Sequence, residues 1–270
     1  MSDLNSNVDE VFKKACERLE ILRGKLHRYE KITDFEWKSI SKDFKRLSNS
    51  DEFRHKSFTA LGTISAMRVM KDEYFQYMDL AASCGSSYFY QLNNVLSGFY
   101  IGEFERVLLY RDIYKQYSGF EQLLSAITGA AQAGVYYTAG DLIKRFFDLG
   151  YIPAEEGDAF KRRKISVGSF VLIEDCANYL MQHNIPEERV CERIGDAARI
   201  ITRITGKPII SAANMLTESG IIYDFIVDDS LDKLLELDWA ISTSAAEKFD
   251  DDICEYFSVG VSPLKSKGEK

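Results

Sequence analysis

The stretch GFYIGEFERVLLY, from Gly98 to Tyr110, decides how the middle of the chain is interpreted. Gly102 interrupts an apolar run, Phe104 follows two positions later, and Val107 and Tyr110 continue at helical spacing. A glycine followed by such a stripe is typical of a turn that ends one helix and precedes another. A single turn of this kind does not identify a fold, whereas its recurrence at a regular spacing would indicate a helical repeat.

The same arrangement recurs further along the chain. In each copy the residues two and five positions after a glycine open the next helix: Gly134 with Tyr136 and Ala139, Gly168 with Phe170 and Ile173, and Gly206 with Pro208 and Ser211. The glycines thus recur with a period in the thirties, as do the helix pairs of helical-repeat proteins, in which each unit covers the apolar face of its neighbour. The sequence therefore predicts a helical repeat domain over residues 51–219.

Two of these copies resemble tetratricopeptide repeats. They are NNVLSGFYIGEFERVLLYRDIY (residues 93–114) and AITGAAQAGVYYTAGDLIKRFF (residues 126–147). In that family a small residue and an aromatic precede a glycine turn, and an aromatic and an alanine open the second helix. Val107 replaces the alanine in the first copy, and Pro208 stands where a later copy needs an aromatic. The resemblance implies an α-solenoid-like stack of helix pairs.

The N-terminal region, residues 1–50, predicts an antiparallel helical hairpin. One apolar seam has a 4-3-4-3 spacing, and the second repeats it: Val8, Phe12, Ala15, Leu19, Leu22, Leu26 and Tyr29, then Trp37, Ile40, Phe44 and Leu47. Thr33 and Glu36 form a capping box between the two segments. The hairpin is favoured over a coiled coil because three heptads are short. The alternative is a homodimer through residues 8–48.

The composition predicts an all-α, cytoplasmic protein. Of 270 residues, four are proline, 46% are hydrophobic and 28% are charged, and helical spacing prevails over strand alternation. The N-terminal segment carries charges throughout, unlike a signal peptide, and no apolar run is long enough to span a bilayer. Five scattered cysteines without a CxxC pair favour reduced thiols.

The C-terminal region, residues 220–257, predicts an acidic helical cap. Between residues 220 and 259 there are eleven acids and two bases, a net charge of −9, which leaves +1 for the rest of the chain. Ser230 or Asp229 caps a helix that turns four apolar side chains inward: Leu231, Leu234, Leu235 and Ile241. The run at residues 221–227 is a short strand or an extended link, and the tail at 258–270 is expected to be disordered.

Two interpretations of the acidic cap stay open. It either attracts a basic partner protein and repels nucleic acid, or it keeps an exposed repeat end soluble. The basic run Lys161–Lys164 is too short to indicate nucleic-acid binding in an acidic protein, and it is expected to cover a helix end.

An enzymatic alternative depends on VDDSLD, in which Asp228, Asp229 and Asp232 match the DDxxD motif of all-α isoprenoid synthases. Carboxylates at this spacing can hold magnesium against a diphosphate. That family places its second acidic motif far downstream, and the acidic run that begins at Asp250 follows Asp232 too soon to serve as one. No zinc, P-loop or nucleophile-elbow pattern occurs, so we expect no cofactor and no metal.

Aromatic residues are dense between residues 86 and 120. Phe89, Phe99 and Phe104 are expected in the core, and three tyrosines are expected to face a groove. We therefore predict a non-catalytic protein–protein interaction protein: an adaptor, a chaperone or a toxin-neutralising immunity protein. The candidate partner-binding residues are Tyr90, Tyr110, Tyr114, Asp228, Asp229, Asp232, Asp250, Asp251 and Asp252.

Overall fold

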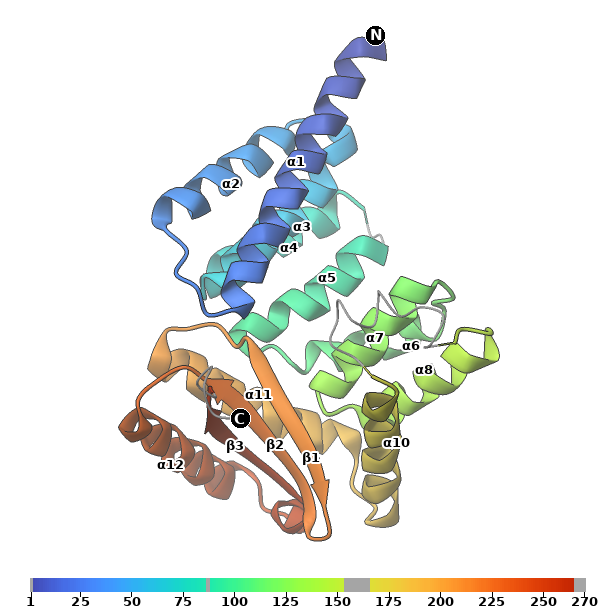
Figure 1. Ribbon diagram of the computed structural model, residues 1–270, viewed down its shortest axis with the longest axis vertical. Helices are drawn as coiled ribbons and strands as arrows, with labels where there is room; N and C mark the ends of the chain where they lie inside the picture. The colour runs from blue at the N-terminus through green and yellow to red at the C-terminus, as the bar shows by residue number, and fades with distance from the viewer. Residues whose placement is uncertain (1, 86–87, 153–165, 265–270) are drawn as a thin grey trace. The chain divides into compact units, whose positions relative to one another are not determined.

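The computed structural model describes residues 2–85, 88–152 and 166–264, and it is mostly helical with a small sheet (Figure 1). The helices are α1 (Ser2–His27), α2 (Asp34–Leu47), α3 (Asp51–Met67), α4 (Lys71–Ser83), α5 (Tyr88–Gly98), η1 (Phe99–Ile101), α6 (Arg106–Tyr114), α7 (Phe120–Gln132), α8 (Tyr136–Asp148), α10 (Val167–Gln182), α11 (Glu187–Thr205), α12 (Leu231–Lys248) and η2 (Asp252–Glu255). The strands are β1 (Ser211–Thr217), β2 (Gly220–Val227) and β3 (Phe257–Pro263).

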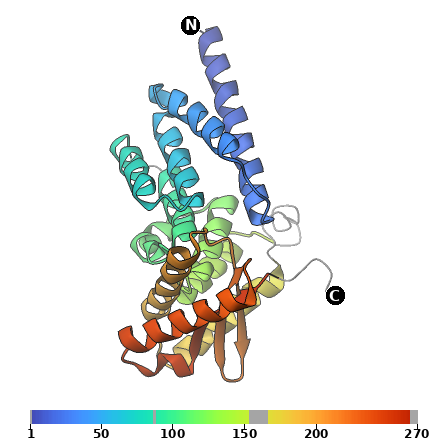
Figure 2. The ribbon, with the colours of Figure 1, turned by 90° about the vertical axis from the view of Figure 1, so that its left-hand side faces the viewer.

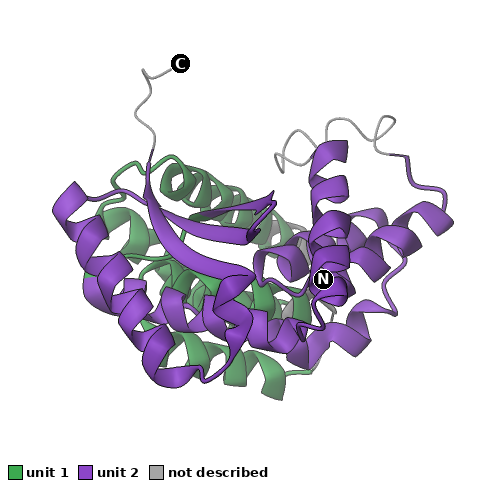
Figure 3. Cartoon of the chain, turned by 90° about the horizontal axis from the view of Figure 1, so that it is seen from below, with its two compact units in different colours: residues 1–101, 205–211 green, residues 102–204, 212–270 purple. Residues whose placement is uncertain are grey.

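The chain divides into two compact units, which differ from the four segments expected from the sequence (Figure 3). Unit 1 comprises residues 1–101 and 205–211, and unit 2 comprises residues 102–204 and 212–270. Residue 50, the predicted end of the hairpin segment, lies inside unit 1, where α2 packs on α3 and the hairpin shares a core with the helices that follow it.

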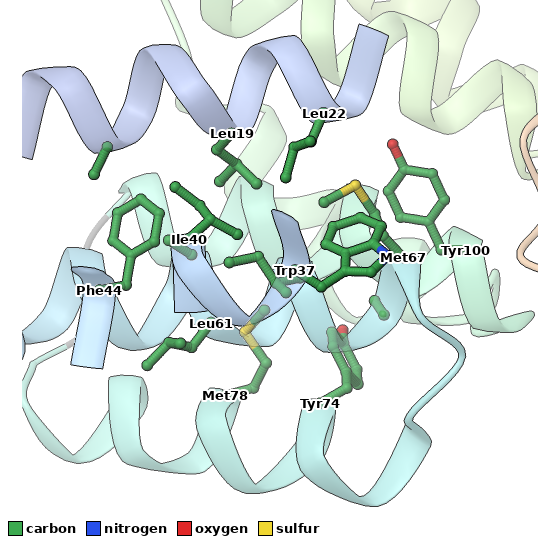
Figure 4. Packing of buried hydrophobic residues seen from close by; sticks show 14 of the residues in the cluster. Leu19, Leu22, Trp37, Ile40, Phe44, Leu61, Met67, Tyr74, Met78 and Tyr100 are labelled. Carbon is green, nitrogen blue, oxygen red and sulfur yellow. The ribbon is translucent and has the colours of Figure 1, made fainter. Parts of the chain in front are cut away.

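Unit 1 is a bundle in which α3 packs against α2, α4 and α5. The capping box at Thr33 and Glu36 is confirmed: the Glu36 N–H donates to Thr33 Oγ1 at 3.3 Å, and the Thr33 N–H donates to Glu36 Oε2 at 2.9 Å. Most residues of the two predicted seams enter one hydrophobic cluster with α3 and α4, including Leu19, Trp37 and Ile40 (Figure 4). The seams therefore pack within the chain.

Unit 2 surrounds α11, whose side chains Val190, Cys191 and Ile194 are fully buried. The turns predicted at Gly102 and Gly134 are confirmed, because these glycines have φ values of 83° and 72°. Both glycines lie directly against α11. Along the chain, α7 packs on α8 and α8 packs on α10. Gly168 differs from the prediction, because it lies inside the first turn of α10 rather than in a turn before it.

The structure is mostly helical, in keeping with the all-α expectation, and it adds a small three-stranded sheet that was not expected. The order of the sheet is β1-β2-β3, and β2 pairs in parallel with β3 from Ile221↔Phe257 to Val227↔Pro263. The predicted acidic cap is thus a strand–helix–strand unit, with α12 connecting β2 to β3. The expected tail at 258–270 begins as strand instead, because Phe257 and its neighbours find their hydrogen-bond partners in β2, on the far side of α12 in the sequence.

Alternate residues of β2 provide the apolar side of the sheet. Tyr223 and Phe225 are buried, the Tyr223 hydroxyl donates to the Gln132 carbonyl of α7 at 2.6 Å, and the Phe225 ring packs edge-on against Phe104 at 5.8 Å. This period of two is the strand pattern that places one face on a core. It holds β2, and with it α12 and β3, against the helices of unit 2.

Candidate functional site

Helix α12 carries two apolar stripes, of which one is buried and the other is exposed to solvent. Ser230 begins the helix by accepting the Lys233 N–H at 3.4 Å. Leu234, Leu237 and Ile241 are buried, as their i, i+3, i+7 spacing requires for one packed face. The second stripe lies at i, i+4 and i+8, and its members are exposed: Leu231 at 70%, Leu235 at 59% and Trp239 at 77%.

The sequence predicts that Leu231 and Leu235 point inward together with Leu234 and Ile241. The structure corrects this for Leu231 and Leu235, because a single helix cannot bury both stripes against one neighbour. In Figure 2, turned by 90° from Figure 1, α12 runs across the front of the strands. Its inner stripe supplies the packing, which leaves the outer one facing solvent.

Acidic side chains surround the outer stripe. Asp228, Asp229 and Asp232 are exposed at the start of α12, and Glu236 is exposed one turn further on. Lys233 donates to Glu236 at 2.8 Å, which compensates one of these charges. We call Leu231, Leu235 and Trp239 with these four acids the α12 outer face. Isolated exposed leucines are ordinary, but three large apolar side chains aligned on one helix are typical of an interaction surface.

A pocket of about 280 Å³ lies between α11, α12 and the start of β3. Its wall is mostly apolar, from Ala197, Ile241, Ala246 and Phe257, and its polar side chains include Arg193 and Asp251. Ser242 and Ala246 also line it, three and seven positions after Trp239, so the pocket adjoins the α12 outer face.

Asp251 is the common hydrogen-bond acceptor in the polar wall of the pocket. It accepts hydrogen bonds from Arg193, from Arg189 at 3.1 Å and from the Ile253 N–H at 3.1 Å. Burial opposes its ionisation, but the Ile253 N–H and the two arginines prevail and lower the pKa of Asp251. The Arg193 guanidinium also lies over the Phe249 ring, 4.2 Å from its centroid.

Two further contacts fix α12 beside the pocket. Asp196 of α11 accepts from Lys248 and from the Ser244 hydroxyl at 2.8 Å, which connects α11 to the last turns of α12. Asp238 accepts the Val261 N–H at 3.0 Å, which connects α12 to β3. The pocket is therefore bounded by three elements whose spacing is set by hydrogen bonds.

The structure brings together only part of the predicted partner-binding set. Asp228, Asp229 and Asp232 belong to the α12 outer face, Asp251 lines the pocket, and Asp250 and Asp252 are exposed on either side of it.

Among the predicted groove tyrosines, the two whose side chains the structure describes, Tyr110 and Tyr114, do not form an exposed groove. Tyr114 is 1% exposed and packs on the Tyr117 ring at 5.6 Å, so it belongs to the core, while Tyr110 is half-buried. Tyr90 belongs to α5, and its side chain lies outside the described residues, as do the side chain of Phe89 and the basic run Lys161–Lys164. Phe99 and Phe104 are buried, as predicted.

Sequence reasoning missed the outer stripe and the pocket for different reasons. The spacing of Leu231, Leu235 and Trp239 was visible, and a second stripe on a helix with a complete inner stripe is a signal of exposure. Arg193 and Asp251 are separated by 58 residues, and no local pattern relates them.

Metal ligands do not gather in the part of the chain that the structure describes, where no group of three or more His, Cys, Asp or Glu side chains is placed to hold an ion. Asp229 of the DDxxD match accepts the Ser230 N–H at 3.0 Å, at the start of α12. The His183 ring packs against the rings of Tyr179 and Tyr256, with centroid distances of 4.5 and 4.4 Å.

No helix within the described ranges combines the length and apolar character needed to cross a membrane. Comparison with known proteins gives no relative: no family model, no curated protein and no solved structure matches the chain.

Proposed function

We propose that this protein is a non-catalytic protein-binding protein, and that its α12 outer face takes a basic segment of a partner protein. The observation that carries the proposal is the exposure of Leu231, Leu235 and Trp239 along one line of an acidic helix. Trp is one of the residue types enriched among those that dominate binding energy. The surrounding acids favour Lys and Arg on the partner and disfavour nucleic acid.

The size of the stripe is adequate for specific binding. Fully covering a large apolar side chain contributes about 1.5–3 kcal/mol, and the stripe has three. Part of this gain is offset by the ordering cost of association, which makes a micromolar interaction more reasonable than a very tight one. The acids act mainly on the rate of encounter and on the choice of partner.

The finer architecture belongs to the same proposal. We propose that, within unit 2, the helix pairs of the predicted repeat domain (residues 51–219) stack in the manner of an α-solenoid and act as the scaffold that presents α12. The succession of packed helices α7, α8 and α10 supports this. Adaptors, chaperones and toxin-neutralising immunity proteins all act by occupying a partner's surface, and a docking helix serves each of them.

Site-specific photo-crosslinking tests the proposal in cells that produce the protein. A photoreactive amino acid replaces Leu235 in one variant and Phe35 in a control, because Phe35 is 79% exposed and lies in unit 1. We expect position 235 to capture a discrete protein that position 35 does not capture. The captured segment should be rich in Lys and Arg with apolar residues among them.

The captured protein is then purified and titrated against the full chain. Trp239→Ala should weaken binding at least tenfold, since loss of a Trp that dominates an interface costs about 2 kcal/mol or more, whereas Phe35→Ala should leave it unchanged. Equal capture at both positions, or a captured partner whose affinity Trp239→Ala does not change, contradicts the proposal.

A further inference from the structure

We propose that the pocket between α11, α12 and β3 is a binding site for one neutral aromatic ring, carried as a side chain by the segment that docks on the α12 outer face. The inference rests on the proposed function for the source of the ring. The preference for a ring follows from the pocket alone, and three of its properties lead to it: its volume, its charge balance and the chemistry of its wall.

The volume fits a single side chain. A cavity of about 150 Å³ is enough to hold benzene, and drug-sized ligands occupy pockets of about 300–1,000 Å³. At about 280 Å³ the pocket lies between these limits. It therefore has room for a phenyl, phenol or indole group and little beyond it, which is the scale of an anchoring side chain rather than of an extended ligand.

The charges in the wall are already compensated. Asp251 accepts from Arg193 and Arg189, and Asp196 accepts from Lys248 and Ser244. An incoming anion would meet two carboxylates, and an incoming cation would have to displace a partner from one of them. Burying a charge without a new partner costs several kcal/mol, so a neutral group is favoured.

The wall distinguishes an aromatic from an aliphatic group. Ala197, Ile241, Ala246 and Phe257 accept either kind. Arg193 and Phe249 favour the ring, because a guanidinium attracts a π face and a phenyl ring packs edge-to-face or offset against another. Their own cation–π contact, at 4.2 Å, shows that this part of the wall already stabilises one ring.

The source of the ring follows from continuity along α12. Trp239, Ser242 and Ala246 are spaced i, i+3 and i+7, so they lie on one side of the helix. The first belongs to the α12 outer face, and the other two line the pocket. A segment docked along the outer face thus reaches the pocket within two helical turns, which makes a side chain of that segment the nearest occupant.

Disulfide tethering tests the ring preference without the partner. Cys254 lines the pocket and is exposed, and Cys84, also exposed, lies in unit 1 and serves as an internal control. Cys176 and Cys191 are buried, and burial raises the pKa of both thiols, so they should not react. The full chain is equilibrated with cysteamine disulfides that carry phenyl, indolyl, cyclohexyl, carboxylate or ammonium groups, and the adducts are quantified by peptide mass spectrometry.

We expect phenyl and indolyl adducts to exceed the charged ones about tenfold or more at Cys254, and to exceed cyclohexyl clearly, with no preference at Cys84. Ala246→Leu fills the pocket from an exposed helical position, so it should remove the preference with the fold intact. Ala240→Leu, the same change at a position that does not line the pocket, should keep it.

Each other result overturns the inference. Equal capture of phenyl and cyclohexyl at Cys254 would show that the pocket does not prefer aromatic groups. Preferred capture of a charged fragment would show that it does not prefer neutral groups. The same adduct pattern at Cys254 and Cys84 would show that the pocket is not a binding site. When the partner is crosslinked to the photoreactive residue at position 235, alkylation of Cys254 by iodoacetamide should be slower than in the free protein, while Cys84 should react at the same rate. If capture at Leu235 fails but the ring preference holds, the proposed function fails and the pocket chemistry stands.

Discussion

Two glycines with almost the same φ allow the cost of a left-handed backbone to be distinguished from the cost of steric crowding. Gly102 has φ 83° and Gly150 has φ 82°. A Cβ on Gly102 would lie 2.9 Å from the Arg199 backbone nitrogen and 3.1 Å from the Ala198 carbonyl carbon, whereas a Cβ on Gly150 would have no atom within 4 Å. Both sites oppose any L side chain through φ, and only Gly102 does so through space as well.

We therefore predict that Gly150→Ala lowers the free energy of unfolding by about 1–2 kcal/mol, the cost of the left-handed conformation. Gly102→Ala should lower it by about 1–3 kcal/mol more, since backbone atoms of α11 cannot move aside cheaply. Urea denaturation of the two variants and the native chain measures both values. Equal losses would show that the loop at Gly102 has room to move away from α11.

Adjacent glutamates at the start of α11 titrate in opposite directions. Glu187 is buried and accepts from the Thr138 N–H at 3.0 Å and the Thr138 hydroxyl at 2.8 Å, so it caps the first turn of α8. Burial outweighs these bonds and raises the pKa of Glu187. The Arg111 guanidinium, 2.5 Å from Glu188, lowers the pKa of that carboxyl.

The two shifts have opposite consequences for stability. A raised folded pKa means that the folded chain retains a proton that the unfolded chain has lost, so Glu187 should weaken the fold as pH rises above 4.5. A lowered folded pKa means that Glu188 should strengthen it as pH rises towards 4.5.

We predict that, between about pH 3 and pH 7, Glu187→Gln gains stability relative to the native chain with rising pH and Glu188→Gln loses it. Urea midpoints at closely spaced pH values give both curves. The neighbouring variants control for each other, because parallel curves would place the pH dependence elsewhere in the chain.

At the scale of one element, α12 offers neighbouring leucines with different surroundings. Leu234 is buried and Leu235 is exposed. Leu234→Ala should cost about 2–5 kcal/mol of unfolding free energy, the range for a buried leucine that leaves a cavity. Leu235→Ala should stay within about 0.5 kcal/mol of the native value, because its side chain packs on little. Chemical denaturation measures both, and a large loss for Leu235→Ala would show that the outer stripe stabilises the fold and is not free to bind.

Helices and strands of this chain differ in how far their sequence determines them. The seams of α1 and α2 have a strong helical period, and the Thr33 cap marks a boundary, so local physics is sufficient. In β1, SAANMLT has few β-branched residues, and in β3, FSVGVSP contains glycine and proline. Strand β1 reaches β2 through the two-residue turn at Glu218 and Ser219, but β3 pairs with β2 across α12, a long-range contact that propensity does not encode. The same distinction applies to the candidate site. The acids of α12 lie close together in the sequence and can be predicted from it, whereas the pocket brings together residues that are far apart in the sequence.

At the scale of the whole molecule, charge is concentrated in one region. Residues 220–259 carry −9 while the rest of the chain carries +1. Such an asymmetry acts over about 10 Å at ordinary salt, so it should orient an approaching basic partner before any contact forms. Apolar contacts at Leu235 and Trp239 act only after docking. The two kinds of residue should therefore appear in different rate constants.

We predict that neutralising Asp228, Asp229 and Asp232 to asparagine slows association with the captured partner and leaves dissociation nearly unchanged. Asparagine preserves the hydrogen-bonding character at the helix start, so α12 should remain folded. Raising the salt concentration should slow association of the native chain more steeply than that of the variant, by an amount within the roughly 10- to 1,000-fold range of electrostatic steering. Stopped-flow tryptophan fluorescence, to which the exposed Trp239 and the buried Trp37 both contribute, measures the rates.

A variant with the same net charge tests whether position matters. Glu17→Gln, Glu52→Gln and Asp79→Asn remove three exposed acids from unit 1 and change the total charge as much as the α12 variant does. Because potentials at a surface fall off within about 10 Å at ordinary salt, changes outside the α12 outer face should affect association less than changes on it. If both triple variants slow association equally, the partner responds to net charge alone, and the acids of the α12 outer face have no specific part in docking.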